Sequence, residues 1–201
     1  MENPNCPKYL QPHLERGAEF HGYLSPGLVI GIFMVDLAKE LLGPCDLIDA
    51  VVETRSCVPD AIQLMTSCTY GNGWMATKDW DKMALTLYDK EAREGVRVFV
   101  DLDKVKKYPL VHQWYMKFGD VDKDEVSRQL IDIGRDILSW QRVRVTHPRK
   151  AKRAFVVCSS CGETHPASDG ELCQRCSGSD DYYEITDKGM VARQQVWPMV
   201  K

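Results

Sequence analysis

The chain of 201 residues is long enough for one substantial hydrophobic core with a small module beside it. Its net charge of −3 and its 27% of charged residues are those of an ordinary globular protein, which argues against a protein devoted to nucleic acid or anionic membranes. The longest apolar run, residues 28–35, is far shorter than the roughly 20 residues that span a bilayer, and the N-terminus lacks the features of a secretion signal. We therefore expect a cytoplasmic protein with no membrane contact.

Hydrophobic periodicity and turn residues predict a mixture of helices and strands. The expected helices lie over residues 13–20, 25–43, 57–68, 108–118 and 124–140. The expected strands lie over residues 47–56, 83–88, 96–100 and 142–145, and the polar turn at 89–95 joins the second and third as a hairpin. The pattern predicts an α+β fold, in which helices pack against an antiparallel sheet.

The second expected helix begins where Ser25 can cap the free amides and where Pro26 suits the first helical position. Apolar residues occupy nearly every face of its first half, so we expect this half to lie in the centre of the core. Gly27 and Gly31 lie four residues apart on one face. Their spacing favours close packing against a neighbouring element, and a ligand that approaches the backbone is the alternative.

The composition changes near residue 148, where the basic stretch 142–153 contains six lysine or arginine residues and no acidic one. We therefore expect a core domain over residues 1–150 and a small C-terminal module over residues 151–201, for which the paired cysteines described next predict a zinc finger of the treble-clef or zinc-ribbon kind. The finger and the basic stretch could recognise a partner protein or nucleic acid. We favour the interpretation that the stretch is a solvated strand and linker, so nucleic acid is not an expected partner.

Four of the eight cysteines have the spacing C-x2-C-x11-C-x2-C, namely Cys158, Cys161, Cys173 and Cys176. Each pair can form a tight knuckle, and four thiolates complete a tetrahedral shell with no open position, which is typical of structural zinc. In a protein that is not secreted this spacing favours a metal over two disulfides, which are the alternative. We expect His165 to be a bystander in the loop. Lys152, Arg153 and Arg175 lie nearby in sequence and could offset the negative charge of the site.

Four segments of the core resemble the FmdE family, which comprises the FmdE component of tungsten or molybdenum formylmethanofuran dehydrogenase and its relatives. In the family's order they are FHGYLSPG at 20–27, CVPDAIQ at 57–63, SCTYG at 67–71 and DWDKMA at 79–84. The module behind the core is similar to the treble-clef finger of some members. The resemblance implies an α+β core, a homodimer, a cleft where histidine and cysteine bind a metal, and association with the molybdenum or tungsten enzyme that fixes carbon dioxide onto methanofuran in methanogenesis.

The sequence departs from the family pattern His-Gly-His-x-Cys-Pro-Gly, because Tyr23 replaces the second histidine and Ser25 replaces the cysteine. Serine keeps the capping role but is a poor zinc ligand. His21 and Cys57 remain as candidate ligands of a second metal ion in the core. Each lies just ahead of a helix start, which attracts anions and thiolates. A histidine bonded to the backbone and a small buried cysteine are the structural alternatives.

Asp60 completes the set of catalytic candidates with His21 and Cys57, since it could either interact with the helix dipole or orient His21. Cys68 lies 11 residues beyond Cys57, about 16 Å along a continuous helix, so it could join the site only if that helix is broken or a second subunit contributes. Cys6 and Cys45 have no partner spacing and are expected to be incidental.

A glycine-rich loop supplies candidates for cofactor binding in the same cleft. Asn72, Trp74 and Lys82 could line it, because an aromatic ring and a cation suit a flat anionic ligand such as a pterin.

Three functions fit these features. The first is an accessory or metal- and ligand-handling protein in one-carbon or molybdenum and tungsten enzyme metabolism. The second is an independent metalloenzyme that uses His21, Cys57 and a bound water. The third is a finger module that binds a partner. No iron–sulfur run or dinucleotide fingerprint is visible, so autonomous electron transfer is not expected, and whether the chain is an enzyme stays open.

Overall fold

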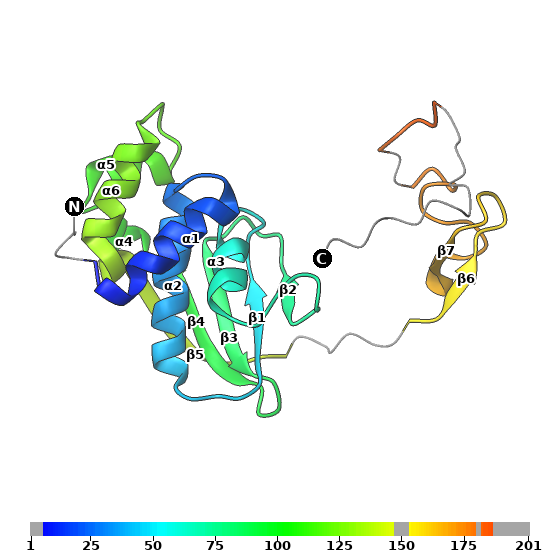
Figure 1. Cartoon of the computed structure of the whole chain (residues 1–201), viewed down its shortest axis with the longest axis horizontal. Coiled ribbons are helices and arrows are strands. Elements are labelled where there is room, and N and C mark those ends of the chain that lie inside the picture. The colour runs from blue at the N-terminus through cyan, green and yellow to red at the C-terminus, as the bar shows by residue number, and fades with distance from the viewer. Residues whose placement is uncertain (1–5, 147–152, 180–181, 187–201) are drawn as a thin grey trace, which may run out of the picture. The chain divides into compact units, whose positions relative to one another are not determined.

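The computed structural model describes residues 6–146, 153–179 and 182–186. Contacts divide the chain into two units, Met1–His147 and Pro148–Lys201, and each unit is described by itself (Figure 1). The expected boundary near residue 150 falls in the segment 147–152, outside the described residues. Within the described part of the chain, no helix is both long enough and apolar enough to cross a membrane.

The first unit contains both helices and strands. Its helical segments are η1 (Lys8–Leu10), α1 (Gln11–His21), α2 (Pro26–Leu42), α3 (Val58–Met65), α4 (Leu102–Val105), α5 (Pro109–Tyr115), α6 (Lys123–Ile133) and η2 (Gly134–Ile137). Its strands are β1 (Ile48–Val52), β2 (Met75–Thr77), β3 (Ala84–Asp89), β4 (Glu94–Val100) and β5 (Leu138–Arg144). The second unit contains β6 (Phe155–Val157), β7 (Thr164–Pro166) and η3 (Ala167–Asp169).

The five strands of the first unit form one sheet in the order β2-β1-β3-β4-β5. Every neighbouring pair is antiparallel except β1 with β2, which is parallel. The expected α+β fold with a largely antiparallel sheet is therefore confirmed, and β2 is a strand that the sequence did not indicate. Helices α1, α2 and α3 lie together in front of the sheet (Figure 1).

Helix α2 forms the centre of the core, where it packs against β3, β4, α3 and α6. The Ser25 hydroxyl accepts a hydrogen bond from the Leu28 amide at 3.2 Å, so the serine caps the helix as expected. All of residues 26–35 are buried, which explains why apolar side chains occupy every face of this segment. Burial of each large apolar side chain contributes about 1.5–3 kcal/mol to stability.

The largest errors in the expected boundaries concern α6, with the strand that follows it, and β1. Helix α6 ends at Ile133, because Gly134 adopts a positive φ of 60° at the C-cap, and Leu138–Arg144 then form an edge strand that pairs with β4. Strand β1 ends at Val52 rather than at residue 56, since the chain then turns away to begin α3. The expected hairpin of β3 and β4 is confirmed, and the Asp89 carboxylate accepts hydrogen bonds from two amides of its turn.

The glycines of α2 allow this helix to approach α3 closely. A Cβ atom built on Gly31 would lie 2.9 Å from the Cβ of Ala61, and one built on Gly27 would lie 2.9 Å from the Sγ of Cys57. Both distances are shorter than a carbon or sulfur contact permits. The expected close packing against a neighbouring element is therefore present, and it places the start of α2 against the start of α3.

We expect Gly31→Ala to lower the free energy of unfolding by about 1–3 kcal/mol, because the new methyl group meets the rigid Cβ of Ala61. Gly17→Ala in α1 is the matched control. Its methyl group would meet only the ends of flexible side chains at 3.2 to 3.3 Å, and alanine favours the helix by up to about 1 kcal/mol. Urea denaturation of both variants measures the difference. A Gly31→Ala protein as stable as the wild type would contradict the packing argument.

Candidate metal centre

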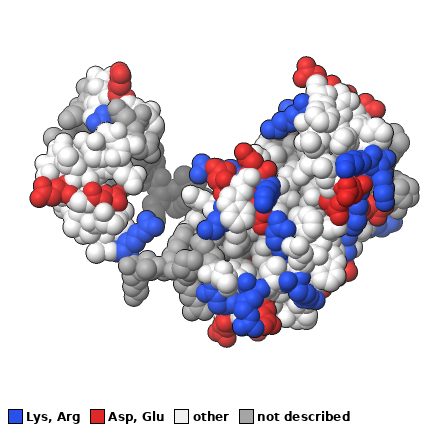
Figure 2. Space-filling model, turned by 180° about the vertical axis from the view of Figure 1, so that it is seen from behind, with Lys and Arg blue, Asp and Glu red and all other residues white. Residues whose placement is uncertain are grey.

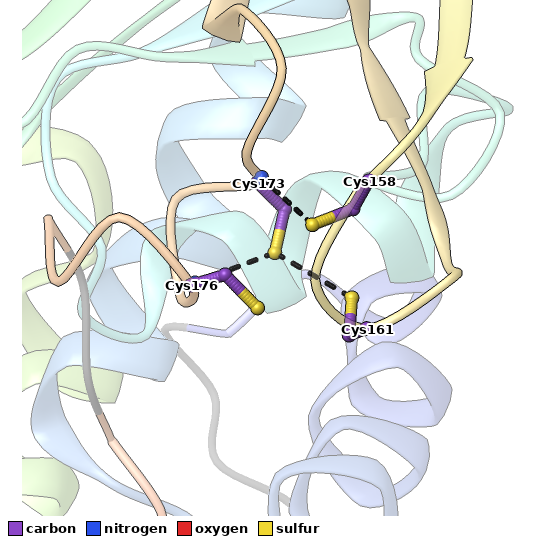
Figure 3. A group of neighbouring side chains, drawn as sticks. All are labelled: Cys158, Cys161, Cys173 and Cys176. Atoms are coloured by element: carbon purple, nitrogen blue, oxygen red, sulfur yellow. Dashed lines mark hydrogen bonds between the residues drawn. The ribbon is translucent and has the colours of Figure 1, made fainter.

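The four cysteines of the finger come together in the second unit. One sulfur from each of Cys158, Cys161, Cys173 and Cys176 lies within 4.8 Å of the others, and no disulfide links them (Figure 3). Among the described residues, this is the only group of three or more histidine, cysteine or carboxylate side chains close enough to share a metal ion. Four convergent sulfurs match the ligand set of a structural zinc site.

Two short turns hold the sulfurs in place. Strand β6 leads directly into Cys158, whose carbonyl accepts from the amide of Gly162, and Gly162 has the positive φ of 77° that this tight turn requires. In the second turn the amide of Ser177 donates to the carbonyl of Cys173 at 2.9 Å. Backbone amides also point at the sulfurs, since the amide of Cys176 donates to the Sγ of Cys173 at 3.4 Å.

The sulfurs cannot all be ionised unless a cation lies between them. Hydrogen bonds from the amides of Cys161 and Cys173 lower the pKa of Cys158 to about 6. The pKa of Cys161 is raised to about 12, because desolvation and hydrogen bonds with the neighbouring thiols outweigh the opposing effect of the Glu163 amide. Like charges this close disfavour each other, and a dication bound between the sulfurs would favour the ionised form of all four.

The other finger residues considered from the sequence lie outside the sulfur cluster. His165 is buried on β7 opposite Val156, and neither of its ring nitrogens has a hydrogen-bond partner within the described residues. Arg175 stacks on the ring of Tyr183 at 4.8 Å. Arg153 is exposed, and Lys152 lies outside the described residues.

In the core unit, the start of α3 collects the remaining candidates. The Nδ1 of His21, the last residue of α1, lies 2.6 Å from the Oδ2 of Asp60. The other oxygen of Asp60 accepts from the Gln63 side chain at 3.4 Å. Of the two roles expected for Asp60, the structure shows a contact that orients His21. The sequence did not single out Gln63, although its spacing of three residues from Asp60 on one helix was the available signal.

Cys57 is the N-cap residue of α3 and lies next to the start of α2. The Ser25 hydroxyl lies 3.5 Å from the Cys57 sulfur and can donate to it. Cys57 has a φ of 53°, a left-handed conformation that is uncommon for residues other than glycine and is concentrated at functional sites. Ser25, at the start of α2, therefore contacts the thiol of Cys57.

The structure does not bring Cys68 to this site. Helix α3 ends at Met65, and the buried thiol of Cys68 lies 3.2 Å from the Ile48 carbonyl at the beginning of β1, whereas Cys57 follows the end of that strand. Burial raises the pKa of Cys68, as expected for an inert thiol. Cys6 is also buried, and the Cys45 thiol bonds to Asp89 at 3.3 Å.

The three residues proposed for cofactor binding do not share a cleft. Asn72 holds its own loop, because its side chain bonds to the backbone of Ser67, Thr69 and Trp74. Trp74 precedes β2 near the beginning of β1, whereas the Lys82 amide donates to Glu53 just after the end of β1. Trp74 and Lys82 therefore lie at opposite ends of that strand.

Trp74 and Lys82 each have a partner of another kind. The Trp74 ring lies under the Lys90 ammonium at 4.8 Å, and the Lys82 ammonium lies 5.5 Å from the Trp80 ring.

Arg142 and Arg144 of the basic stretch each have a partner within the sheet of the first unit. Arg144 forms an ion pair with Glu94 at 2.7 Å, and Arg142 lies over the Trp140 ring. Residues 147–152 of the stretch lie outside the described residues. On the face seen in Figure 2, basic and acidic side chains of the larger unit are interspersed.

A cavity of about 650 Å³ lies beside the core site, and the sequence did not point to it. It is lined by Ser56, which precedes Cys57, by Asp81 and Met83 ahead of β3, and by Trp114 and other residues around the α5–α6 turn. These segments are far apart in the sequence, so no periodic pattern could have joined them.

Known proteins resemble both units. Residues 20–147 match the family model described as "FmdE, Molybdenum formylmethanofuran dehydrogenase operon", and residues 149–184 match "FmdE treble clef zinc finger". The crystal structure of a protein from Syntrophus aciditrophicus, described as "tungsten formylmethanofuran dehydrogenase subunit e (fmde)-like", is 41% identical, with a TM-score of 0.80 over 91% of this chain and 100% of that chain.

A curated protein of Archaeoglobus fulgidus, named "Probable S-adenosyl-L-methionine-binding protein", is 30% identical over 95% of this chain. The chain spans 59% of the length of that relative. The family models together cover most of the sequence, and the similar crystal structure extends over both units. The chain therefore belongs to the FmdE family and carries that family's treble-clef zinc finger after its core domain.

Proposed function

We propose that this protein is an accessory protein that handles a metal ion or a small ligand for a molybdenum or tungsten enzyme of one-carbon metabolism. The observation that carries the proposal is the pair of contacts at the start of α3, where Asp60 orients His21 and Ser25 contacts Cys57. Family membership supports the metabolic setting, because the related crystal structure is named for a component of formylmethanofuran dehydrogenase.

The His21–Asp60 contact is the arrangement that prepares a histidine to bind a metal. A carboxylate on one ring nitrogen fixes the tautomer and leaves the other nitrogen basic. In this chain the carboxylate occupies Nδ1, so Nε2 is the nitrogen that would hold an ion. The Cys57 sulfur, at the start of α3, is the second donor.

Two protein donors leave most positions around an ion open, in contrast to the closed shell of the finger. Such a site holds a metal more weakly and gives a ligand or a partner protein access to it. This difference favours transfer or presentation over a permanent structural role. The alternative proposal, an independent metalloenzyme, would use the same two donors with a bound water.

We also propose that the protein forms a homodimer and associates with its partner enzyme in that state, as family membership suggests. In this proposal the zinc keeps the finger folded, and the folded finger provides a rigid surface that contacts the partner.

A second candidate concerns the ligand. The name of the archaeal relative suggests S-adenosyl-L-methionine, and the cavity beside Cys57 has room and aromatic lining for a molecule of that size. We expect saturable binding of S-adenosyl-L-methionine in equilibrium dialysis of the full-length protein. The absence of binding at about 1 mM, which corresponds to about −4 kcal/mol, would remove this candidate.

We expect Cys161→Ala to abolish the finger's zinc and unfold the second unit, because a structural zinc contributes roughly 10–16 kcal/mol to a small finger. Plasma emission spectrometry should give about one zinc per chain for the wild type and none for the variant. Limited proteolysis should then cleave the tail selectively. Cys45→Ala is the matched control, since Cys45 lies in the core unit away from the cluster. A variant that retained zinc would contradict the four-sulfur assignment.

We expect the wild type to bind a second, weaker metal ion when titrated with Co²⁺. His21→Ala and Cys57→Ser should each remove that ion without affecting the finger, and Asp60→Asn should weaken it about 10–100-fold by releasing the His21 ring. The sulfur-to-cobalt absorption band measures both sites. His112→Ala, on α5, is the control histidine. Equal second-site binding by the wild type and His21→Ala would refute the proposal.

A further inference from the structure

The cavity beside Cys57 has the size of a small-molecule site. Its volume of about 650 Å³ lies within the range of roughly 300–1,000 Å³ that is usual for such sites. Thr54 and Ser56 contribute from the segment after β1, and Met83 lies near the backbone of Gly27, which the Cys57 sulfur also contacts. The cavity therefore adjoins the core site without including His21.

Aromatic side chains form part of the cavity wall. Trp114 and Tyr115, at the end of α5, have ring centroids 6.3 Å apart and tilted by 53°. Burial raises the pKa of Tyr115, so its phenol stays protonated and is a hydrogen-bond donor. Together with Met83, these rings provide a surface on which a flat apolar or heteroaromatic group can pack.

Charged side chains of both signs surround this wall. Asp81 and Asp120 line the cavity together with Lys117 and Lys123. None of the four side chains forms an ion pair or a hydrogen bond with any other described residue. Two acidic and two basic residues, all of them exposed, therefore line the same cavity, where their side chains can bind a ligand that carries both charges.

The backbone is strained at this cavity. Four residues other than glycine have a positive φ in the described part of the chain: Cys57, Asp81, Arg93 and Lys117. Asp81 and Lys117 line the cavity, and Cys57 follows its Ser56. Such conformations are costly, and they persist where the fold positions a functional group. At this cavity the two residues concerned, Asp81 and Lys117, carry opposite charges.

We propose that this cavity binds a zwitterionic small molecule that carries an ammonium and a carboxylate group beside a flat ring. The ring packs on Trp114 and Tyr115, the carboxylate meets the lysines, and the ammonium meets the aspartates. The inference rests on the proposal that the core unit handles a small ligand, and it places that ligand next to the Cys57 site. Binding here needs none of the metal donors, so the two proposals can fail separately.

A series of probes with one common ring tests the ligand class. L-tryptophan carries both charges, tryptamine only the ammonium, indole-3-propionate only the carboxylate, and indole neither. Ligand-observed NMR titrations of the full-length protein give the four dissociation constants. We expect tryptophan to bind about tenfold more tightly than either singly charged probe, and indole to bind most weakly, because each charge adds a charge-assisted hydrogen bond.

Two paired variants assign each charge to its partner. The double variant Lys117→Gln with Lys123→Gln should weaken the binding of tryptophan and of indole-3-propionate about tenfold and leave the binding of tryptamine unchanged. The double variant Asp81→Asn with Asp120→Asn should weaken the binding of tryptophan and of tryptamine and leave the binding of indole-3-propionate unchanged. Asparagine tolerates the positive φ of Asp81, so this variant keeps the backbone. Lys107→Gln and Asp136→Asn are control changes at positions outside the cavity.

The binding measurements give different results according to whether the inference is right or wrong. Selective loss of the complementary probe in each paired variant supports the inference. Equal affinity of all four probes, no binding at millimolar concentration, or paired variants with unchanged selectivity would overturn it. Cobalt titration of the same paired variants keeps the metal proposal distinct, since it should still show both ions whatever the probes do.

Discussion

The close approach of α2 and α3 is the constraint on which the core site depends. Gly27 and Gly31 leave no side chain between the two helices, so the sulfur of Cys57 and the methyl of Ala61 lie against the α2 backbone. As a result, the N-caps of both helices meet, and Ser25 contacts Cys57. Helix α1 ends beside the same point and delivers His21 to Asp60. Residues from three helices are thus gathered by a packing feature made of two glycines.

The two candidate metal centres are built on opposite principles. The finger gathers four sulfurs within one short segment, with backbone amides directed at them, and its shell would be closed. The core site has one oriented histidine and one thiol, in positions that depend on long-range packing. In the proposal, an ion held by these two donors alone would keep open positions. Tyr23 still contributes, since its ring lies 5.5 Å from that of His21.

The neighbouring cavity gives the core site a second chemical character. Cys57 lies at the start of α3 and follows the cavity residue Ser56, whereas lysines and aspartates line the cavity around the α5–α6 turn and the loop before β3. Asp81 and Lys117 line this cavity with a positive φ, and strain of this kind is concentrated at functional sites. Metal handling and ligand binding therefore become parts of one proposed activity at adjacent places.

The sequence by itself determined the features that depend on local spacing. The cysteine knuckles, the cap and burial of α2, the β3–β4 hairpin and the family motifs can all be recognised from a few neighbouring residues. Only the tertiary structure decided where distant residues meet. In the structure, α6 ends before Gly134, and Leu138 belongs to a strand. The side chain of Asn72 bonds within its own loop, and Cys68 lies at the other end of β1 from Cys57. The tertiary structure also assembled the cavity from three segments, because strand pairing and helix packing bring together side chains whose separation along the chain carries no periodic signal.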